Sequence, residues 1–174
     1  MSMHPFRKNR CILYSFILVS ALLELTFDLM VALDGAFPDV QKFMTIVGFI
    51  AAALSTLKLV WACLLLAYNN KPNKKLIFTR ASYQYASLLV ASLISALITI
   101  PLFTKIPAQC DFKRESDGMA GFYCAWLSLA IVFPWAIVFL SGASAFLIYR
   151  TALMLNLSLD RNIVALDESG AIPL

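Results

Sequence analysis

The sequence predicts an all-α integral membrane protein, a bundle of four transmembrane helices, and three observations lead to this prediction. First, 61% of the 174 residues are hydrophobic and 14% are charged, whereas a soluble domain is about half apolar and about a quarter charged. Second, the chain contains four apolar runs that are long enough to cross a bilayer. Third, Lys and Arg are unevenly distributed among the segments between these runs. A soluble domain of this size would need many more polar residues to cover its surface.

The four spans are expected as helices, because a bilayer core is crossed by roughly 20 helical residues and offers no partner to free backbone groups. The expected ranges are 11–33, 43–68, 81–103 and 122–149. Together they form one domain at 11–150, between a basic tail at 1–10 and a second tail at 151–174. The segments between the spans combine Pro or Gly with charged residues, which is typical of turns.

The basic residues predict that both termini lie in the cytosol. Lys and Arg occur without any acid at 1–10 and at 69–80, whereas 34–42 and 104–121 contain both signs of charge. The positive-inside rule therefore places the first two segments inside and the other two outside. A cleaved signal peptide is the alternative for 1–33, but the apolar run is long and contains two acids, so we expect the first span to remain. The membrane would be the plasma membrane or one of the secretory pathway.

The first span contains two acids, Glu24 and Asp28, in an otherwise apolar helix. Ser20, Glu24, Asp28 and Ala32 recur every four residues and share one helix face. A central acid costs roughly 2.5–3.5 kcal/mol on insertion scales, so this face should point into the bundle. Lys58 is the basic residue of the second span, and counting from the helix ends puts it at a depth close to that of Glu24.

Two interpretations of these charges remain open. In the structural interpretation, Glu24 and Lys58 form an ion pair that holds the first two helices together, and Asp28 is hydrated near the outer interface. In the functional interpretation, Glu24 and Asp28 form a proton or cation relay. We favour the structural interpretation, because the third and fourth spans offer a relay only hydroxyls and Gln84.

Small residues at a spacing of four predict where the helices pack closely. On the second span these are Gly48, Ala52 and Thr56, and on the third they are Ser87, Ala91, Ser95 and Thr99. A similar patch lies at 141–145 of the fourth span. Most of these edges should be used inside the bundle, and one that is left over would serve self-association.

Cys110 and Cys124 flank the long segment that we expect outside, where an oxidising environment favours a disulfide. Two free thiols are the alternative. The other two cysteines, Cys11 and Cys63, fall in the inner half of the membrane and are expected to pack as small apolar residues. No pair has the CxxC or Cys/His spacing of a metal site.

The sequence favours no enzyme class. His4 is the only histidine, and phosphate loops, GxSxG and HExxH motifs are missing, so we expect no catalytic, metal or cofactor site. The basic residues form no stripe along which nucleic acid would bind. The expected partner is the lipid bilayer, with a second copy of the chain or other membrane proteins as further candidates.

The layout resembles MARVEL-domain proteins, in particular the short fungal ones. The resemblance lies in four spans, two cytosolic ends, and a cysteine motif that runs from Cys110 to "CAWLSLAIVFPWAIVF" beginning at Cys124, and it covers about 11–150. It implies a non-enzymatic role in organising membrane domains, traffic or junction-like contacts. The alternative class is a small transporter or channel subunit that uses Glu24, Asp28 and Lys58.

Overall fold

The computed structural model of the protein describes residues 5–33, 38–68, 80–104, 110 and 120–159. The regular elements of this part of the chain are four helices. They are α1 (Pro5–Leu33), α2 (Pro38–Tyr68), α3 (Ala81–Phe103) and α5 (Ala120–Met154). Each is long and apolar enough to cross a membrane. The predicted all-helical fold with four such helices is confirmed.

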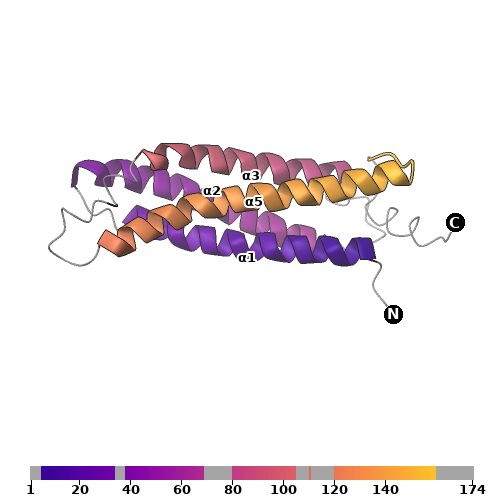
Figure 1. Ribbon diagram of the computed structural model, residues 1–174, viewed down its shortest axis with the longest axis horizontal. Helices are drawn as coiled ribbons and strands as arrows, with labels where there is room; N and C mark the ends of the chain where they lie inside the picture. Colours follow the sequence, from indigo (N-terminus) through magenta and orange to yellow (C-terminus); the bar gives the residue numbers. More distant parts are fainter. Residues whose placement is uncertain (1–4, 34–37, 69–79, 105–109, 111–119, 160–174) are drawn as a thin grey trace.

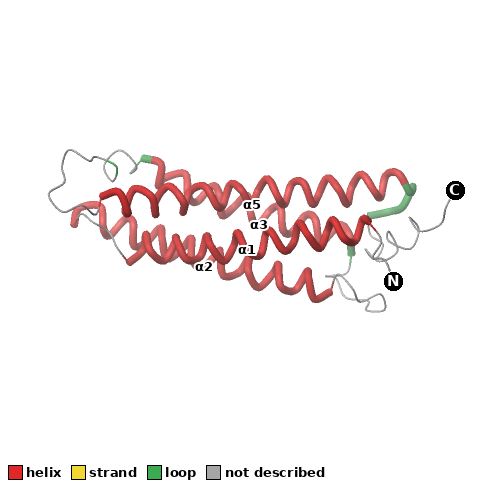
Figure 2. Tube along the Cα trace, turned by 60° about the horizontal axis from the view of Figure 1, so that its bottom comes forward, coloured by secondary structure: helices red, strands yellow, loops and turns green. Residues whose placement is uncertain are grey.

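The helices lie side by side along the long axis of an elongated bundle, and consecutive helices run in opposite directions (Figures 1 and 2). α1 packs against α2 and α5, and α3 packs against the same two helices. The bundle is therefore a ring in the order α1, α2, α3, α5. This up-and-down arrangement brings the starts of α1 and α3 to one end of the bundle, together with the ends of α2 and α5 (Figure 1).

The helices extend beyond the apolar runs that predict them. α1 begins at Pro5, inside the segment expected as a tail, α2 begins at Pro38, and α5 continues to Met154. A span prediction counts apolar residues, whereas backbone hydrogen bonds continue a helix through polar ones. Proline at the first helical position is favourable, because its fixed φ suits the helix and its missing N–H would have no partner there.

The exterior of the bundle is apolar. Phe16 on α1, Leu57 on α2, Leu97 on α3 and Phe139 on α5 are exposed by 59, 66, 49 and 74%. The interior, in contrast, contains charged and hydroxyl side chains beside many alanines. Water would favour the opposite distribution, so the pattern is consistent with a multi-pass membrane protein.

Contacts between side chains join the helices along their length. Between α1 and α5, Phe27 stacks on Phe133 with ring centroids 5.6 Å apart. Between α2 and α3, the rings of Trp61 and Tyr83 have centroids 5.6 Å apart. Between α1 and α3, the buried Tyr14 hydroxyl donates to Gln84 Oε1 at 3.2 Å. The Tyr14–Gln84 bond gives Gln84 a role in helix packing, which the sequence did not predict.

α1 and α2 approach each other closely at Gly48. A Cβ atom added to Gly48 would lie 2.8 Å from the Ala32 Cβ and 2.8 Å from the Ala32 backbone nitrogen. Backbone atoms cannot move aside as a flexible side chain can. This position therefore requires glycine, because any Cβ atom would collide with Ala32. Such close approach at small residues is typical of packed membrane helices.

We expect Gly48→Ala to lower the free energy of unfolding by about 1–3 kcal/mol, the usual cost of overpacking. The matched control is Gly142→Ala on α5, where nothing lies within 4 Å of an added Cβ atom. That change should be neutral or stabilising by up to about 1 kcal/mol, because alanine is the better helix former. Denaturant titration in detergent micelles, followed by circular dichroism, measures both. Equal changes in the free energy of unfolding for Gly48→Ala and Gly142→Ala would contradict the close contact between Gly48 and Ala32.

Candidate functional site: a buried polar cluster

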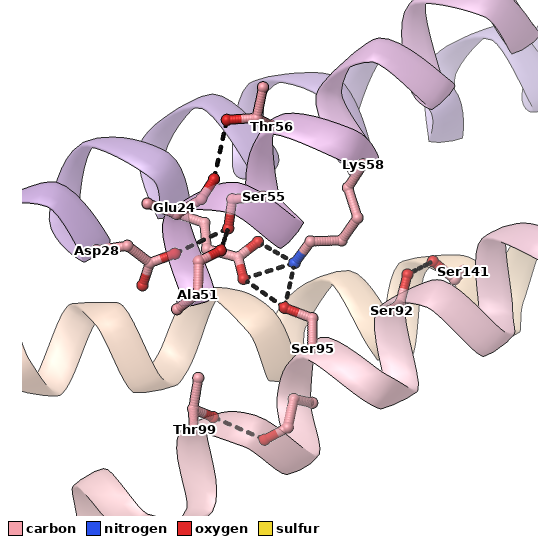
Figure 3. A network of polar contacts seen from close by, with 12 residues as sticks. Glu24, Asp28, Ala51, Ser55, Thr56, Lys58, Ser92, Ser95, Thr99 and Ser141 are labelled. Atoms are coloured by element: carbon pink, nitrogen blue, oxygen red, sulfur yellow. Dashed lines mark hydrogen bonds and ion pairs between the residues drawn. The ribbon is translucent and has the colours of Figure 1, made fainter. Parts of the chain in front are cut away.

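Five polar side chains from three helices meet in the interior of the bundle (Figure 3). They are Glu24 and Asp28 of α1, Ser55 and Lys58 of α2, and Ser95 of α3, each exposed by at most 2%. The acids come inward because they lie on the α1 face that packs against α2. The structure thus places the three charged residues predicted from the sequence in one cluster.

Lys58 is the centre of this cluster. Its ammonium nitrogen contacts both carboxylate oxygens of Glu24 and donates to Ser95 Oγ at 2.8 Å. The Ser95 hydroxyl in turn donates to Glu24 Oε1 at 3.1 Å. An ammonium has three hydrogens to donate, and three acceptor atoms surround it here. Glu24, Lys58 and Ser95 therefore form a closed ring of contacts that ties α1, α2 and α3 together.

Asp28 has a different environment from Glu24. Its Oδ2 atom accepts a hydrogen bond from Ser55 Oγ at 2.8 Å, while its Oδ1 atom is buried and has no hydrogen-bond partner. Asp28 is 1% exposed, so the expectation of a hydrated side chain near the outer interface is wrong. The reason is that Asp28 lies on the α1 face that packs against α2, where Ser55 contacts its carboxyl group.

The predicted helix-packing residues divide into two groups. Gly48, Ala52, Ser95 and Thr99 are buried in the bundle, whereas Ser87 and Ala91 are half-buried and Thr56 is exposed. Thr56, Ser87 and Thr99 donate to carbonyls of their own helix, at Ala52, Tyr83 and Ala96 respectively. Such local bonds are common for hydroxyl residues in helices. Ser95, in contrast, bonds Lys58 of α2 and Glu24 of α1.

Two hydroxyl residues of the interior were not predicted. Ser55 contacts Asp28, and Ser92 lies 3.0 Å from Ser141, oxygen to oxygen, which joins α3 to α5. Each lies three residues before a residue that was predicted, Lys58 or Ser95, and therefore on the same helix face. Spacing from those predicted residues is the signal that could have found them.

A pocket of about 300 Å³ opens between α2 and α3 beside the cluster. It is lined by Leu54, Leu57, Lys58, Val60, Trp61, Leu88, Ala91 and Ile94. Lys58 is the charged residue of this lining, and its ammonium group is engaged by Glu24 and Ser95. The pocket wall is otherwise made of apolar or aromatic side chains, so it suits hydrocarbon better than water.

Cys110 and Cys124 are bonded to each other. The sulfur atoms of Cys110 and Cys124 are 2.03 Å apart, and the bond connects the segment after α3 to the first turns of α5. Cys11 and Cys63 are not disulfide-bonded. In the described part of the chain, no group of three His, Cys, Asp or Glu side chains is arranged to hold a metal ion.

The ring around Lys58 predicts strong coupling between Glu24 and Lys58. We expect Lys58→Leu to lower the free energy of unfolding by about 3–5 kcal/mol, because it leaves a buried carboxylate without its partner. The double variant Glu24→Leu/Lys58→Leu should recover much of that loss. Denaturant titration of the two single variants and the double variant completes the cycle.

Thr26 provides the control for this cycle, because it is exposed and donates to Leu22 of its own helix at 3.0 Å. Thr26→Val combined with Lys58→Leu should show additive losses, as independent sites do. Additive losses for Glu24 and Lys58 as well would contradict their contact.

Comparisons with known proteins identify no family for this chain. No protein-family model, no curated protein and no solved structure matches this chain. The resemblance to MARVEL-domain proteins therefore stays a prediction. What the chain does has to be argued from the cluster and from the surface of the bundle.

Proposed function

We propose that this chain is a non-enzymatic multi-pass membrane protein that organises membrane domains or membrane traffic through helix and lipid contacts, as the resemblance to MARVEL-domain proteins implies. The observation that carries the proposal is the separation of polar and apolar groups. The charged side chains of the spans are buried and bonded, whereas large apolar side chains cover the outside. The exposed apolar surface of such a bundle is available for contact with lipid and with other membrane helices.

The buried cluster supports a structural role for the charges. Lys58 has its donors directed at Glu24 and Ser95, and the pocket beside it has an otherwise apolar wall. A transport path needs polar groups that lead from the cluster to water. The arrangement around Lys58 instead resembles a fixed link between three helices.

The outer face of α5 offers a surface for such contacts. Val132, Phe139, Phe146 and Leu153 follow each other at a spacing of seven, and they are exposed by 57, 74, 63 and 63%. A seven-residue repeat forms one continuous stripe along a helix that packs against another helix. In this proposal the stripe contacts lipid and a second copy of the chain or another membrane protein.

The second candidate function is that of a small transporter or channel subunit. The observation that favours it is Asp28, whose Oδ1 atom is buried without a hydrogen-bond partner. Ionisable groups inside a membrane are rare and frequently mark ion or proton pathways. This candidate would use Glu24, Asp28 and Lys58 as its polar groups.

A dilution experiment in vesicles tests the proposal. Donor- and acceptor-labelled copies are reconstituted at increasing lipid-to-protein ratios, and proton flux is followed in the same vesicles. We expect energy transfer to stay above the value for random mixing, and proton flux to equal that of protein-free vesicles. Random energy transfer together with proton flux that Asp28→Asn abolishes would contradict the proposal and favour a transporter.

A matched pair of variants locates the contact surface in this experiment. Phe139→Ala/Phe146→Ala removes two exposed rings from α5, and Phe16→Ala/Phe49→Ala removes two from α1 and α2. The α5 variant should reduce energy transfer towards the random value, whereas the control should leave it unchanged. Equal reductions would show that the α5 stripe has no special role.

In the proposed topology both termini face the cytosol, in the plasma membrane or a membrane of the secretory pathway. The distribution of Lys and Arg supports this orientation. The bond between Cys110 and Cys124 also supports it, because disulfides persist on the oxidising side of such membranes.

Thiol labelling tests this orientation. On sealed membranes that expose the non-cytosolic side, an impermeant maleimide should label Cys110 and Cys124 only after treatment with an impermeant reductant. The double variant Cys110→Ser/Cys124→Ser should remain unlabelled and thereby exclude Cys11 and Cys63. A glycan on Asn156, which stands in an N-x-S sequon, would place the C-terminal side in the lumen and contradict the proposal.

A further inference from the structure

The hydroxyl of Ser55 lies within hydrogen-bond distance of two oxygen atoms. Ser55 Oγ is 2.8 Å from Asp28 Oδ2 and 3.0 Å from the Ala51 carbonyl oxygen (Figure 3). A hydroxyl carries one hydrogen, and an ionised carboxylate only accepts. If Asp28 were ionised, the single Ser55 hydroxyl hydrogen would form one good hydrogen bond to either oxygen atom, or two weaker bonds shared between them. A proton on Asp28 Oδ2 gives each contact its own hydrogen, because Asp28 then donates to Ser55 and Ser55 donates to Ala51.

Glu24 has the opposite surroundings, although it lies only one turn away. Both of its oxygens contact the Lys58 ammonium group, and Oε1 also accepts from Ser95. Three donor contacts stabilise the ionised form of a carboxyl group. The Oδ1 atom of Asp28, in contrast, has no donor. The two carboxyl groups of one helix face therefore occupy environments that suit different protonation states.

The balance of charge in the cluster points the same way. Glu24 and Lys58 neutralise each other, so an ionised Asp28 would leave the cluster with one uncompensated negative charge. The groups that act on Asp28 are Glu24 on its own helix, and Ser55 and Lys58 on α2. α3 has no charged residue between Ala81 and Phe103. α5 has no charged residue between Cys124 and Tyr149. An isolated charge at this depth is strongly unfavourable, and one proton removes it.

We propose that Asp28 is a proton-binding site, which holds a proton in the native bundle with Ser55 as its partner, while Glu24 stays ionised against Lys58. The inference goes beyond the proposed function, because a membrane organiser needs no bound proton. It makes Asp28 the member of the cluster that can exchange its proton without breaking the link between α1, α2 and α3. The ligand is the proton, and a monovalent metal cation is the alternative that the test has to distinguish.

Infrared difference spectroscopy of the full chain in vesicles tests the proposal at neutral pH. The spectrum of the native protein minus that of Asp28→Asn should contain the carbonyl band of a protonated carboxylic acid, which shifts in D2O. Glu24→Gln is the matched control, and its difference spectrum should contain a carboxylate band instead. Ser55→Ala should shift the frequency of the acid band, because the acid loses its hydrogen-bond partner.

Thermal melting gives the second readout. Asparagine has the shape of the protonated acid and no charge, so Asp28→Asn should melt within a few degrees of the native protein, whereas Glu24→Gln should melt far lower or fail to fold. If Glu24→Gln does not fold, the infrared comparison of the native protein, Asp28→Asn and Ser55→Ala decides alone. A difference spectrum with a carboxylate band for Asp28 would overturn the proposal. So would a melting temperature that rises in Na⁺ relative to choline at constant ionic strength, with the rise lost in Asp28→Asn.

Discussion

The contact between Lys58 and Glu24, completed by Ser95, is the interaction on which the bundle depends. Between helices in lipid the hydrophobic effect supplies little net attraction, because lipid tails are as apolar as the side chains. Close packing and polar contacts therefore decide which faces meet. A buried ion pair is not by itself a strong source of stability, since both charges lose their water. Its effect here is to fix the register of α1, α2 and α3, because a shift of one helix would leave a charge without a partner.

The seam between α1 and α2 shows how this register is kept along the bundle. Glu24 meets Lys58, Asp28 meets Ser55, and Ala32 meets Gly48, so positions ascend on α1 as they descend on α2. This is the order that an antiparallel pair requires. The charge pair selects the register near the middle of the seam. The missing side chain of Gly48 then lets the two backbones approach at one end.

The sequence predicts the four helices and the pairing of Glu24 with Lys58 for a simple reason. Long apolar runs and intramembrane charges each have few ways to be accommodated in lipid. Hydroxyl residues are less restricted, because a serine or threonine can bond its own helix as readily as a neighbour. Ser55 and Thr56 illustrate this difference. They are adjacent in sequence, yet Ser55 contacts Asp28 of α1 as well as Ala51 of its own helix, whereas Thr56 bonds Ala52 of its own helix. The rotation of α2 decides between them, and with it the burial of Asp28. The spacing of four among small residues on α2 does not determine that rotation, whereas Lys58, three residues after Ser55, indicates it.

The distinction between a structural cluster and a relay reduces to one residue. The opposite charges of Glu24 and Lys58 are in contact, so the loss of either charge would weaken the link between α1, α2 and α3. Asp28 is buried beside them, yet its polar contact is to Ser55, a neutral residue. A proton can therefore enter or leave Asp28 while the ring around Lys58 stays intact. A bundle that organises membranes would keep this proton as a fixed part of its core, and a transporter would move it. The two functions share the same fold and differ in whether water ever reaches Asp28.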